Sequence, residues 1–238
     1  MWSELRGLQD GCDYGTPPRD GVPVTLEIDD ARVTVPYGSS VMFAASQAGR
    51  PIPKLCATDT LEPFGSCRVC LVEIEGRSGF PASCTTPVSE GMKVKTQTER
   101  LQRLRRGVLE LYLSDFPENE IEGGWSEFHT TLKDEGVYRH PYGEGRNHFD
   151  YPVDLSNPYF LFDPSKCIVC SRCVRACAEI QGTFAITISG RSFDSKVVAS
   201  QDEPFMTSEC VSCGACVQAC PSHALVEKSL FEGNYSHA

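Results

Sequence analysis

The sequence has no run of apolar residues that approaches the roughly 18–20 needed to cross a bilayer. Its first residues, Met1 to Arg6, do not place a basic segment before an apolar one, so we expect no secretory signal and a cytoplasmic protein. Positive charge is also scarce: the net charge of −10 argues against nucleic acid as the main partner. No glycine-rich phosphate loop follows a clear strand, and nothing marks a nucleophile, so no catalytic residue is predicted.

Cysteine is absent from residues 85–166 but abundant on either side. Of the 13 cysteines, four lie between Cys56 and Cys84, and eight lie between Cys167 and Cys220. In a reducing cytosol cysteines bind metals more often than they form disulfides. The two groups therefore predict metal sites.

The first group follows the pattern C-x10-C-x2-C-x13-C and consists of Cys56, Cys67, Cys70 and Cys84. A [2Fe–2S] cluster needs four thiolates, two on each iron, and a C-x2-C pair can supply two of them from one tight loop. Zinc also binds four cysteines tetrahedrally, and the spacing alone does not exclude it. We interpret this group as a [2Fe–2S] site, with structural zinc as the alternative.

The second group contains the run C-x2-C-x2-C-x3-C twice, with an offset of 43 residues. This is the run of bacterial two-cluster ferredoxins, in which the fourth cysteine of each run ligates the other cluster. One [4Fe–4S] cluster is therefore assigned to Cys167, Cys170, Cys173 and Cys220. The second [4Fe–4S] cluster is assigned to Cys210, Cys213, Cys216 and Cys177. Neither zinc nor disulfides require such a doubled run.

The remaining cysteine and three histidines receive no ligand role. Cys12 stands alone in the N-terminal arm. His129, His140 and His148 lie in the segment without cysteine, where a histidine ligand would lack the three thiolates it needs beside it. We interpret them as surface or hydrogen-bonded histidines.

Hydrophobic patterning predicts an α+β protein. Alternating residues predict a hairpin of strands 24–28 and 32–35 with a turn at Asp29–Asp30, then a helix capped by Ser39 or Ser40 and ended by Gly49. Further strands are expected at 68–75 and 92–95, and a hairpin is expected from 186–188 and 196–199. The expected divisions are an extended arm (1–21), a β-grasp [2Fe–2S] domain (22–97), a linker helix with a connecting segment (98–159), a two-[4Fe–4S] ferredoxin domain (160–232) and a tail (233–238).

The linker helix is predicted over residues 98–113. Thr96 and Glu99 have the spacing of a capping box. One helical face should carry Leu101, Leu104, Val108 and Leu111. A solvated face should carry Arg100, Arg103, Arg105 and Arg106.

The residues around the ligands resemble a known family. Residues 55–58, 64–74 and 81–87 resemble the N-terminal [2Fe–2S] domain of NAD-dependent formate dehydrogenase alpha subunits. The same module resembles the large iron–sulfur subunit of complex I and the small diaphorase subunit of NAD-reducing hydrogenases. Residues 166–182 are similar to the ferredoxin domain that follows in the formate dehydrogenases, and the resemblance covers about residues 22–232.

This resemblance implies a non-catalytic subunit that passes electrons between a molybdopterin or tungstopterin subunit and a flavin/NAD-binding iron–sulfur subunit. Two departures stand out. The family usually has a [4Fe–4S] site of one His and three Cys after the linker helix, whereas residues 112–132 have no cysteine, so we expect that cluster to be absent. The family's alpha chain also continues into a pterin-binding domain, whereas this sequence ends at Ala238, so catalysis is expected on another polypeptide.

Three other assignments compete with this one. The same clusters would suit the diaphorase-side subunit of a hydrogenase. An iron–sulfur subunit of succinate dehydrogenase is disfavoured, because its first site resembles C-x4-C-x2-C and the first gap here is x10. A free-standing ferredoxin is disfavoured by the long segment 114–159, since such segments usually need a partner surface to become ordered.

Overall fold

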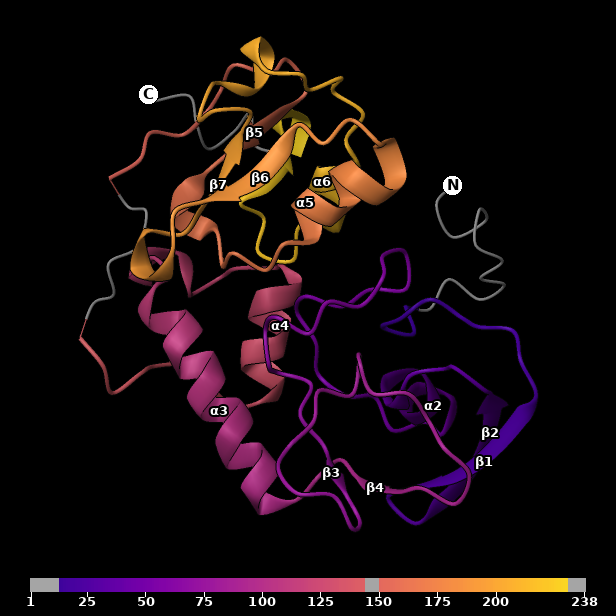
Figure 1. The fold of residues 1–238 in the computed structure, drawn as a ribbon. Coiled ribbons are helices and arrows are strands. Elements are labelled where there is room, and N and C mark those ends of the chain that lie inside the picture. Colours follow the sequence, from indigo (N-terminus) through magenta and orange to yellow (C-terminus); the bar gives the residue numbers. More distant parts are fainter. Residues whose placement is uncertain (1–12, 144–149, 231–238) are drawn as a thin grey trace. The chain divides into compact units, whose positions relative to one another are not determined.

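A computed structural model of the chain describes residues 13–143 and 150–230 (Figure 1). It forms two compact units, one within Met1–Leu109 and one within Glu110–Ala238. Cys12 and His148 lie outside the described residues. None of the helices in the described ranges is long and apolar enough to span a membrane.

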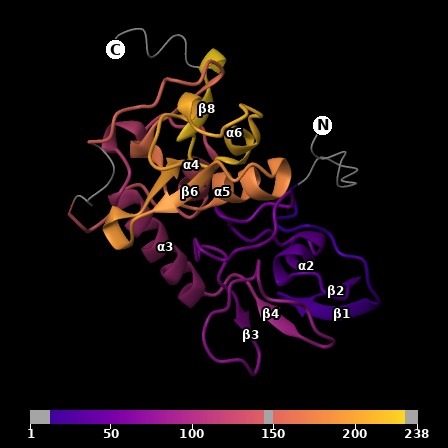
Figure 2. The same cartoon turned by 45° about the horizontal axis from the view of Figure 1, so that its top comes forward.

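The first unit is built on a mixed four-stranded sheet. Its strands are β1 (Pro23–Ile28), β2 (Ala31–Pro36), β3 (Glu73–Ile74) and β4 (Lys93–Lys95), in the order β2-β1-β4-β3. Strands β1 and β4 are parallel, and the other pairs are antiparallel. Helix α2 (Val41–Gln47) lies beside β1 and β2 (Figure 2). This β-grasp arrangement confirms the predicted fold class for the first unit.

The predicted β1–β2 hairpin is confirmed. Ile28 pairs with Ala31, so Asp29 and Asp30 form a two-residue turn, and both have positive φ angles of 46° and 67°. Such a turn matches the twist of the flanking strands, and aspartate tolerates its left-handed backbone. The Asp29 carboxylate also accepts hydrogen bonds from the Thr96 hydroxyl and from the Thr96 N–H, the latter at 2.7 Å.

Helix α2 begins and ends as predicted. The Ser40 hydroxyl accepts a hydrogen bond from the N–H of Phe43 at 3.0 Å, and Gly49 has φ = 68° just after the helix. Its buried face packs into an apolar core with the inward side chains of β1 and β4. This core sets the position of the loops that carry the first cysteine group.

The predicted strand 68–75 is largely absent. Only Glu73–Ile74 (β3) joins the sheet, and Leu71 forms an isolated bridge with Ala82. The physical reason is the left-handed backbone of Arg68, with φ = 58°, which turns the chain between Cys67 and Cys70 and breaks the extended conformation.

Helix α3 (Glu99–Ser114) confirms the predicted linker helix but not its cap. The hydroxyl of Thr98, not Thr96, accepts a hydrogen bond from the N–H of Leu101 at 3.2 Å. Thr96 is unavailable because its hydroxyl and N–H bind Asp29, far away in the sequence.

The predicted faces of α3 are also partly wrong. The buried positions follow an i, i+4 row of Leu101, Arg105, Leu109 and Leu113. Leu104 and Leu111 are exposed. Arg105 is 0% exposed, and its Nη2 donates to the backbone oxygen of Leu71 at 2.7 Å, so it does not belong to a solvated face.

The second unit consists of short elements. Its helices are α4 (Glu127–Asp134), α5 (Arg172–Arg175), the π-helix η3 (Ala176–Gln181) and α6 (Ala215–Ala219). Its 3-10 turns are η1 (Glu118–Glu120), η2 (Pro164–Lys166), η4 (Ser192–Asp194), η5 (Phe205–Thr207) and η6 (Lys228–Leu230). Strands β5 (Phe160–Phe162) and β8 (Leu225–Glu227) pair antiparallel, as do β6 (Ile186–Ser189) and β7 (Lys196–Ala199). The β6–β7 pair confirms the hairpin predicted between the two cysteine runs.

Helix α4 lies in the connecting segment that follows the linker helix, where the sequence predicted no further helix. The Ser126 hydroxyl caps it by accepting a hydrogen bond from the His129 N–H, and Phe128 and Leu132 are buried. The His129 ring is hydrogen-bonded at both nitrogens: Nε2 donates to the Glu120 carbonyl at 2.9 Å, and Nδ1 lies 2.7 Å from the Ser126 hydroxyl. Helix α4 therefore belongs to the second unit.

Candidate iron–sulfur sites

The first cysteine group gathers four buried side chains from three loops. Cys56, Cys67, Cys70 and Cys84 are each at most 2% exposed. The N–H of Cys67 lies 3.5 Å from Sγ of Cys56, and Sγ of Cys70 lies 3.5 Å from Sγ of Cys84. The structure thus brings together all four residues that the sequence assigned to this site.

The backbone around this group turns toward the sulfurs. Gly65 and Arg68 both have positive φ angles, of 73° and 58°. The positive φ angle favours glycine at position 65, and a Cβ atom there would make a tight contact of 3.1 Å with Cγ2 of Thr85. Left-handed backbone of this kind directs N–H groups into a concave surface that suits anions, including iron–sulfur clusters.

The four thiols share hydrogen bonds in a site that excludes water. Hydrogen bonds from Cys67 and Cys84 hold the pKa of Cys56 far below its usual range. A hydrogen bond from Cys84 lowers the pKa of Cys70 to about 7. The pKa of Cys84 is raised because its proton binds Cys56 and Cys70. Thiolates are the form of cysteine that binds iron.

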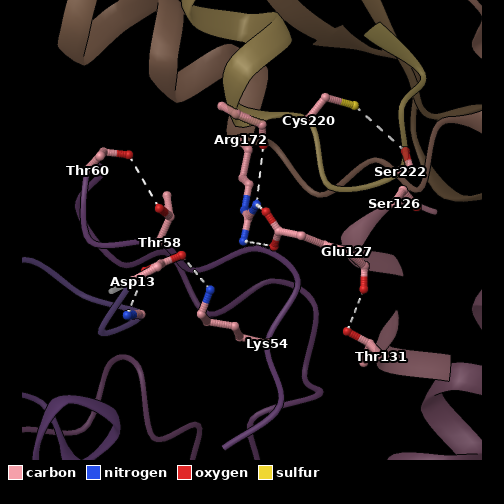
Figure 3. A network of polar contacts seen from close by, with 12 residues as sticks. Asp13, Lys54, Thr58, Thr60, Ser126, Glu127, Thr131, Arg172, Cys220 and Ser222 are labelled. Carbon is pink, nitrogen blue, oxygen red and sulfur yellow. Dashed lines mark hydrogen bonds and ion pairs between the residues drawn. The ribbon is translucent and has the colours of Figure 1, made fainter. Parts of the chain in front are cut away.

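The Cys56 loop continues into a buried carboxylate, Asp59. Its Oδ2 accepts a hydrogen bond from the N–H of Tyr14 at 3.3 Å. The neighbouring Asp13 forms an ion pair with Lys54 at 2.5 Å, and its Oδ1 accepts from the Asp59 N–H at 3.0 Å (Figure 3). Burial, followed by the charge of Asp13, raises the pKa of Asp59 from 3.8 to about 6.

Replacing Asp59 by Asn should remove a pH dependence of stability. The folded state holds the Asp59 proton more tightly than the unfolded state, so its contribution to stability falls as pH rises from about 4 to about 6. We expect D59N to be more stable than the wild type at pH 7.5 by roughly 1–3 kcal/mol, and to lose most of that advantage at about pH 4. Denaturant unfolding at both pH values measures this, with substitution of the exposed Asp20 by Asn as the control. The same difference in free energy of unfolding between D59N and the wild type at both pH values would contradict the prediction.

Six of the eight cysteines of the second group belong to the apolar core of the second unit or pack against it. Cys173, Cys177 and Cys216 belong to its apolar cluster. That cluster also contains Phe160, Phe162 and Phe205, whose rings pack edge to face. Cys170 is also buried, Cys167, Cys210 and Cys220 are half-buried, and Cys213 is exposed. The clusters would therefore take the place of apolar side chains in this core.

The two runs of the second group repeat the same backbone conformation. Val169 and Ser212 occupy equivalent positions in the two runs, and both have positive φ angles. The same holds two residues further along, at Ser171 and Gly214. The latter two are the N-caps of α5 and α6. A positive φ at a β-branched residue such as Val169 is strained and persists only where the surroundings enforce it. The strain turns N–H groups toward sulfur, as with Ser212 N–H and Cys210 Sγ at 3.4 Å.

The fourth cysteine of each run interacts with the first and third cysteines of the other run. Burial, and then neighbouring thiolates that include Cys220, raise the pKa values of Cys167 and Cys173. Burial, and then thiolates that include Cys177, raise the pKa of Cys210 and that of Cys216, the latter to about 12. This neighbourhood has the crossed pattern on which our ligand assignment relies, and the assignment of each cysteine to a cluster stays a prediction.

Both fourth cysteines accept hydrogen bonds from beyond the runs. Sγ of Cys177 lies 3.2 Å from the Ala185 N–H and 3.2 Å from the Thr183 hydroxyl. Sγ of Cys220 lies 3.4 Å from the Leu225 N–H, and the Ser222 hydroxyl is 3.8 Å away. Donors of this kind tune the reduction potentials of iron–sulfur clusters.

A buried arginine that was not predicted from the sequence joins two ligand loops. Arg172 lies between Cys170 and Cys173, and its guanidinium binds both carboxylate oxygens of Glu127 at 2.8 and 2.9 Å (Figure 3). Its Nη1 also lies 3.4 Å from the carbonyl of Ala219, next to Cys220. The sequence does show a charged residue, Arg172, between two ligand cysteines. Its partner Glu127 could not be identified, because it lies 45 residues away in α4.

The donor set of both groups is thiolate sulfur supported by backbone N–H groups, which fits iron–sulfur clusters. None of the 12 cysteines that the structure describes forms a disulfide. Among the described residues, no group of three or more His, Cys, Asp or Glu side chains could hold a single metal ion.

Two protein families match the two cysteine groups. A 2Fe-2S iron-sulfur cluster binding domain matches residues 21–99, and a 4Fe-4S dicluster domain matches residues 166–224. The first match favours the iron–sulfur interpretation over zinc. Both confirm the predicted order of a [2Fe–2S] domain followed by a two-cluster domain, while the total number of clusters stays a prediction.

Three curated relatives belong to NAD(P)-linked enzymes. The NADP-reducing hydrogenase subunit HndD of Solidesulfovibrio fructosivorans is 36% identical over 213 residues, which is 86% of this chain and 36% of the relative. The mitochondrial NADH-ubiquinone oxidoreductase 78 kDa subunit of Candida albicans is 32% identical over 73% of this chain and 25% of the relative. The NADPH-Fe(3+) oxidoreductase subunit alpha of Geobacter sulfurreducens is 37% identical over 71% and 20%. The chain thus spans about a fifth to a third of these relatives.

A solved structure matches nearly the whole chain. It is a chain in the crystal structure of NAD+-reducing [NiFe]-hydrogenase in the H2-reduced state, with a TM-score of 0.75 and 30% identity. The match covers 87% of this chain and 88% of that one. None of these four proteins is a formate dehydrogenase, so they support the wider class of NAD(P)-linked enzymes.

Proposed function

Because the chain belongs to the family of iron–sulfur electron-transfer subunits of NAD(P)-linked oxidoreductases, we propose that it relays electrons through one [2Fe–2S] and two [4Fe–4S] clusters. The electrons would pass between a flavin subunit that reacts with NAD(P) and a separate catalytic subunit. Three sets of cysteines, one four-cysteine loop group and two crossed runs, support this number of clusters.

The chain's own residues hold the clusters and control their surroundings. Each bound cluster supplies one-electron transfer without proton chemistry of its own. The 12 assigned cysteines would ligate the irons, and the left-handed loops would direct N–H groups toward the sulfurs. The apolar core around the second group excludes water, which strengthens every hydrogen bond to sulfur. No residue of the relay needs to act as an acid or a base.

The match over 87% of this chain to a chain in the NAD+-reducing [NiFe]-hydrogenase structure is the observation that supports a hydrogenase-type complex as the first candidate. A molybdenum or tungsten formate dehydrogenase is the second candidate. It is supported by the resemblance of residues 55–87 and 166–182 to the formate dehydrogenase alpha subunits. Both candidates assign the chain the same role and differ in the metal of the catalytic partner.

Elemental analysis of the complex, purified natively through a tag on this chain, tests the proposal. This subunit should contribute about 10 irons (2 + 4 + 4). Nickel in near-stoichiometric amount would support the hydrogenase, and molybdenum or tungsten would support the formate dehydrogenase. Zinc in place of iron would overturn the relay, and a lone 26.2 kDa species that shuttles electrons would show a free-standing carrier instead.

The iron count also tests the absence of a fourth cluster. Residues 112–132 carry no cysteine and instead form the end of α3, the turn η1 and most of α4. About 14 irons in the separated subunit, rather than about 10, would show that a further four-iron cluster is bound after all.

A further inference from the structure

We propose that the hydroxyl of Thr183 tunes the reduction potential of one [4Fe–4S] cluster by donating a hydrogen bond to Cys177. This inference rests on the proposed function, because it requires Cys177 to be a cluster ligand. Thr183 lies outside both cysteine runs, six residues beyond Cys177, and is not one of the assigned ligands.

Ligation of Cys177 to iron would leave one direction for this hydrogen bond. Oγ1 of Thr183 lies 3.2 Å from Sγ of Cys177, which is buried. A cysteine bound to iron is a thiolate and carries no proton, so the hydroxyl must be the donor. The Ala185 N–H donates to the same sulfur at 3.2 Å, so two donors approach it from one short segment.

The backbone of this segment is strained in a way that holds Thr183 in place. Gly182, which ends η3, has φ = 78°, and Phe184 has φ = 55°. A bulky residue with positive φ costs free energy and persists only where other contacts enforce it. Here the enforced conformation places the Thr183 hydroxyl and the Ala185 N–H on the same sulfur atom.

The hydrogen bond should raise the midpoint potential of its cluster. The reduced cluster carries one more negative charge than the oxidised cluster, so a donor to sulfur stabilises the reduced form more. The effect is strong where the sulfur is buried, because water does not compete for it. Removing the hydroxyl should therefore lower the potential.

The other crossing cysteine provides a built-in comparison. The Ser222 hydroxyl lies 3.8 Å from Sγ of Cys220, and the Leu225 N–H lies 3.4 Å away, so both donors are farther than those of Cys177. A longer hydrogen bond is weaker. Of the two hydroxyls, Thr183 should therefore have the larger influence on its cluster.

The test is an EPR-monitored redox titration of the purified complex with Thr183→Val, Thr183→Ala and Thr183→Ser in this chain. In T183V and T183A, one [4Fe–4S] cluster should move to a lower midpoint potential while the other two clusters keep theirs. In T183S, which keeps the hydroxyl, that cluster should stay near the wild-type value. Ser222→Ala should shift the other [4Fe–4S] cluster, by a smaller amount.

The outcomes separate this inference from the proposed function. Full iron content with unchanged potentials in T183V and T183A would overturn the role of Thr183 and leave the relay intact. Equal shifts of both [4Fe–4S] clusters would also overturn it, because they would indicate a general change of structure. A wild-type chain that contains no iron–sulfur signal at all would overturn the proposed function itself.

Discussion

Cys220→Ser should remove the [4Fe–4S] cluster of Cys167, Cys170 and Cys173 and leave the cluster of Cys210, Cys213 and Cys216 in place. A serine oxygen is a poor substitute for a thiolate on iron, and a cluster with three thiolates and a half-buried open position is exposed to loss. The substituted cysteine belongs to the second run, whereas the cluster that is lost is the one held by the first run. This follows because the fourth ligands are expected to cross.

The iron content and the EPR spectrum measure this effect. We expect the subunit to fall from about 10 irons to about 6, with one four-iron signal lost. Cys12→Ser is the matched control and should keep all of its iron, since Cys12 was assigned no ligand role. A C220S protein with full iron content and unchanged signals would contradict the assignment of Cys220 as a ligand.

The parts of the fold that could be predicted are those set by neighbours in the sequence. The Asp29–Asp30 turn and the cap at Ser40 depend on residues within a few positions, and the structure has both. The same holds for the cysteine spacing, because a ligand loop is a local structure. Local chemistry of this kind is visible in the sequence without knowledge of what packs against it.

The parts that failed depend on partners that are distant in sequence. Thr96 was expected to cap α3, but Asp29 takes both of its hydrogen-bonding groups, which leaves the cap to Thr98. Arg105 was expected in solvent, but the Leu71 carbonyl provides it with a buried acceptor. Glu127 escaped notice for the same reason, since its partner Arg172 is 45 residues away.

Glu127→Gln should destabilise the second unit and raise the potential of the cluster near Arg172. Arg172 has a side chain only 2% exposed, and the neutral amide would leave its charge with a weaker partner. Hydrogen bonds to charged groups contribute about 1.5–3 kcal/mol, and we expect a loss near the lower end because the Glu127 side chain is 48% exposed to water. The less neutralised cation beside Cys170 and Cys173 should favour the reduced cluster.

Unfolding in denaturant and an EPR-monitored redox titration measure the two effects separately. Glu122→Gln is the matched control, because it makes the same change in net charge at an exposed position of the same segment. We expect E122Q to resemble the wild type in both measurements. Equal shifts in E127Q and E122Q would show that total charge, and not the contact with Arg172, sets the potential.

The double variant with Cys220→Ser and Glu127→Gln would decide which cysteines share a cluster. Arg172 lies between Cys170 and Cys173, so the shift caused by E127Q marks the cluster of that run. With crossed ligands, C220S removes this cluster, and E127Q should no longer shift any four-iron signal. With uncrossed ligands, C220S would remove the other cluster, and the E127Q shift would persist in the four-iron signal that remains. The potential of one cluster thus reports the ligand connectivity of both.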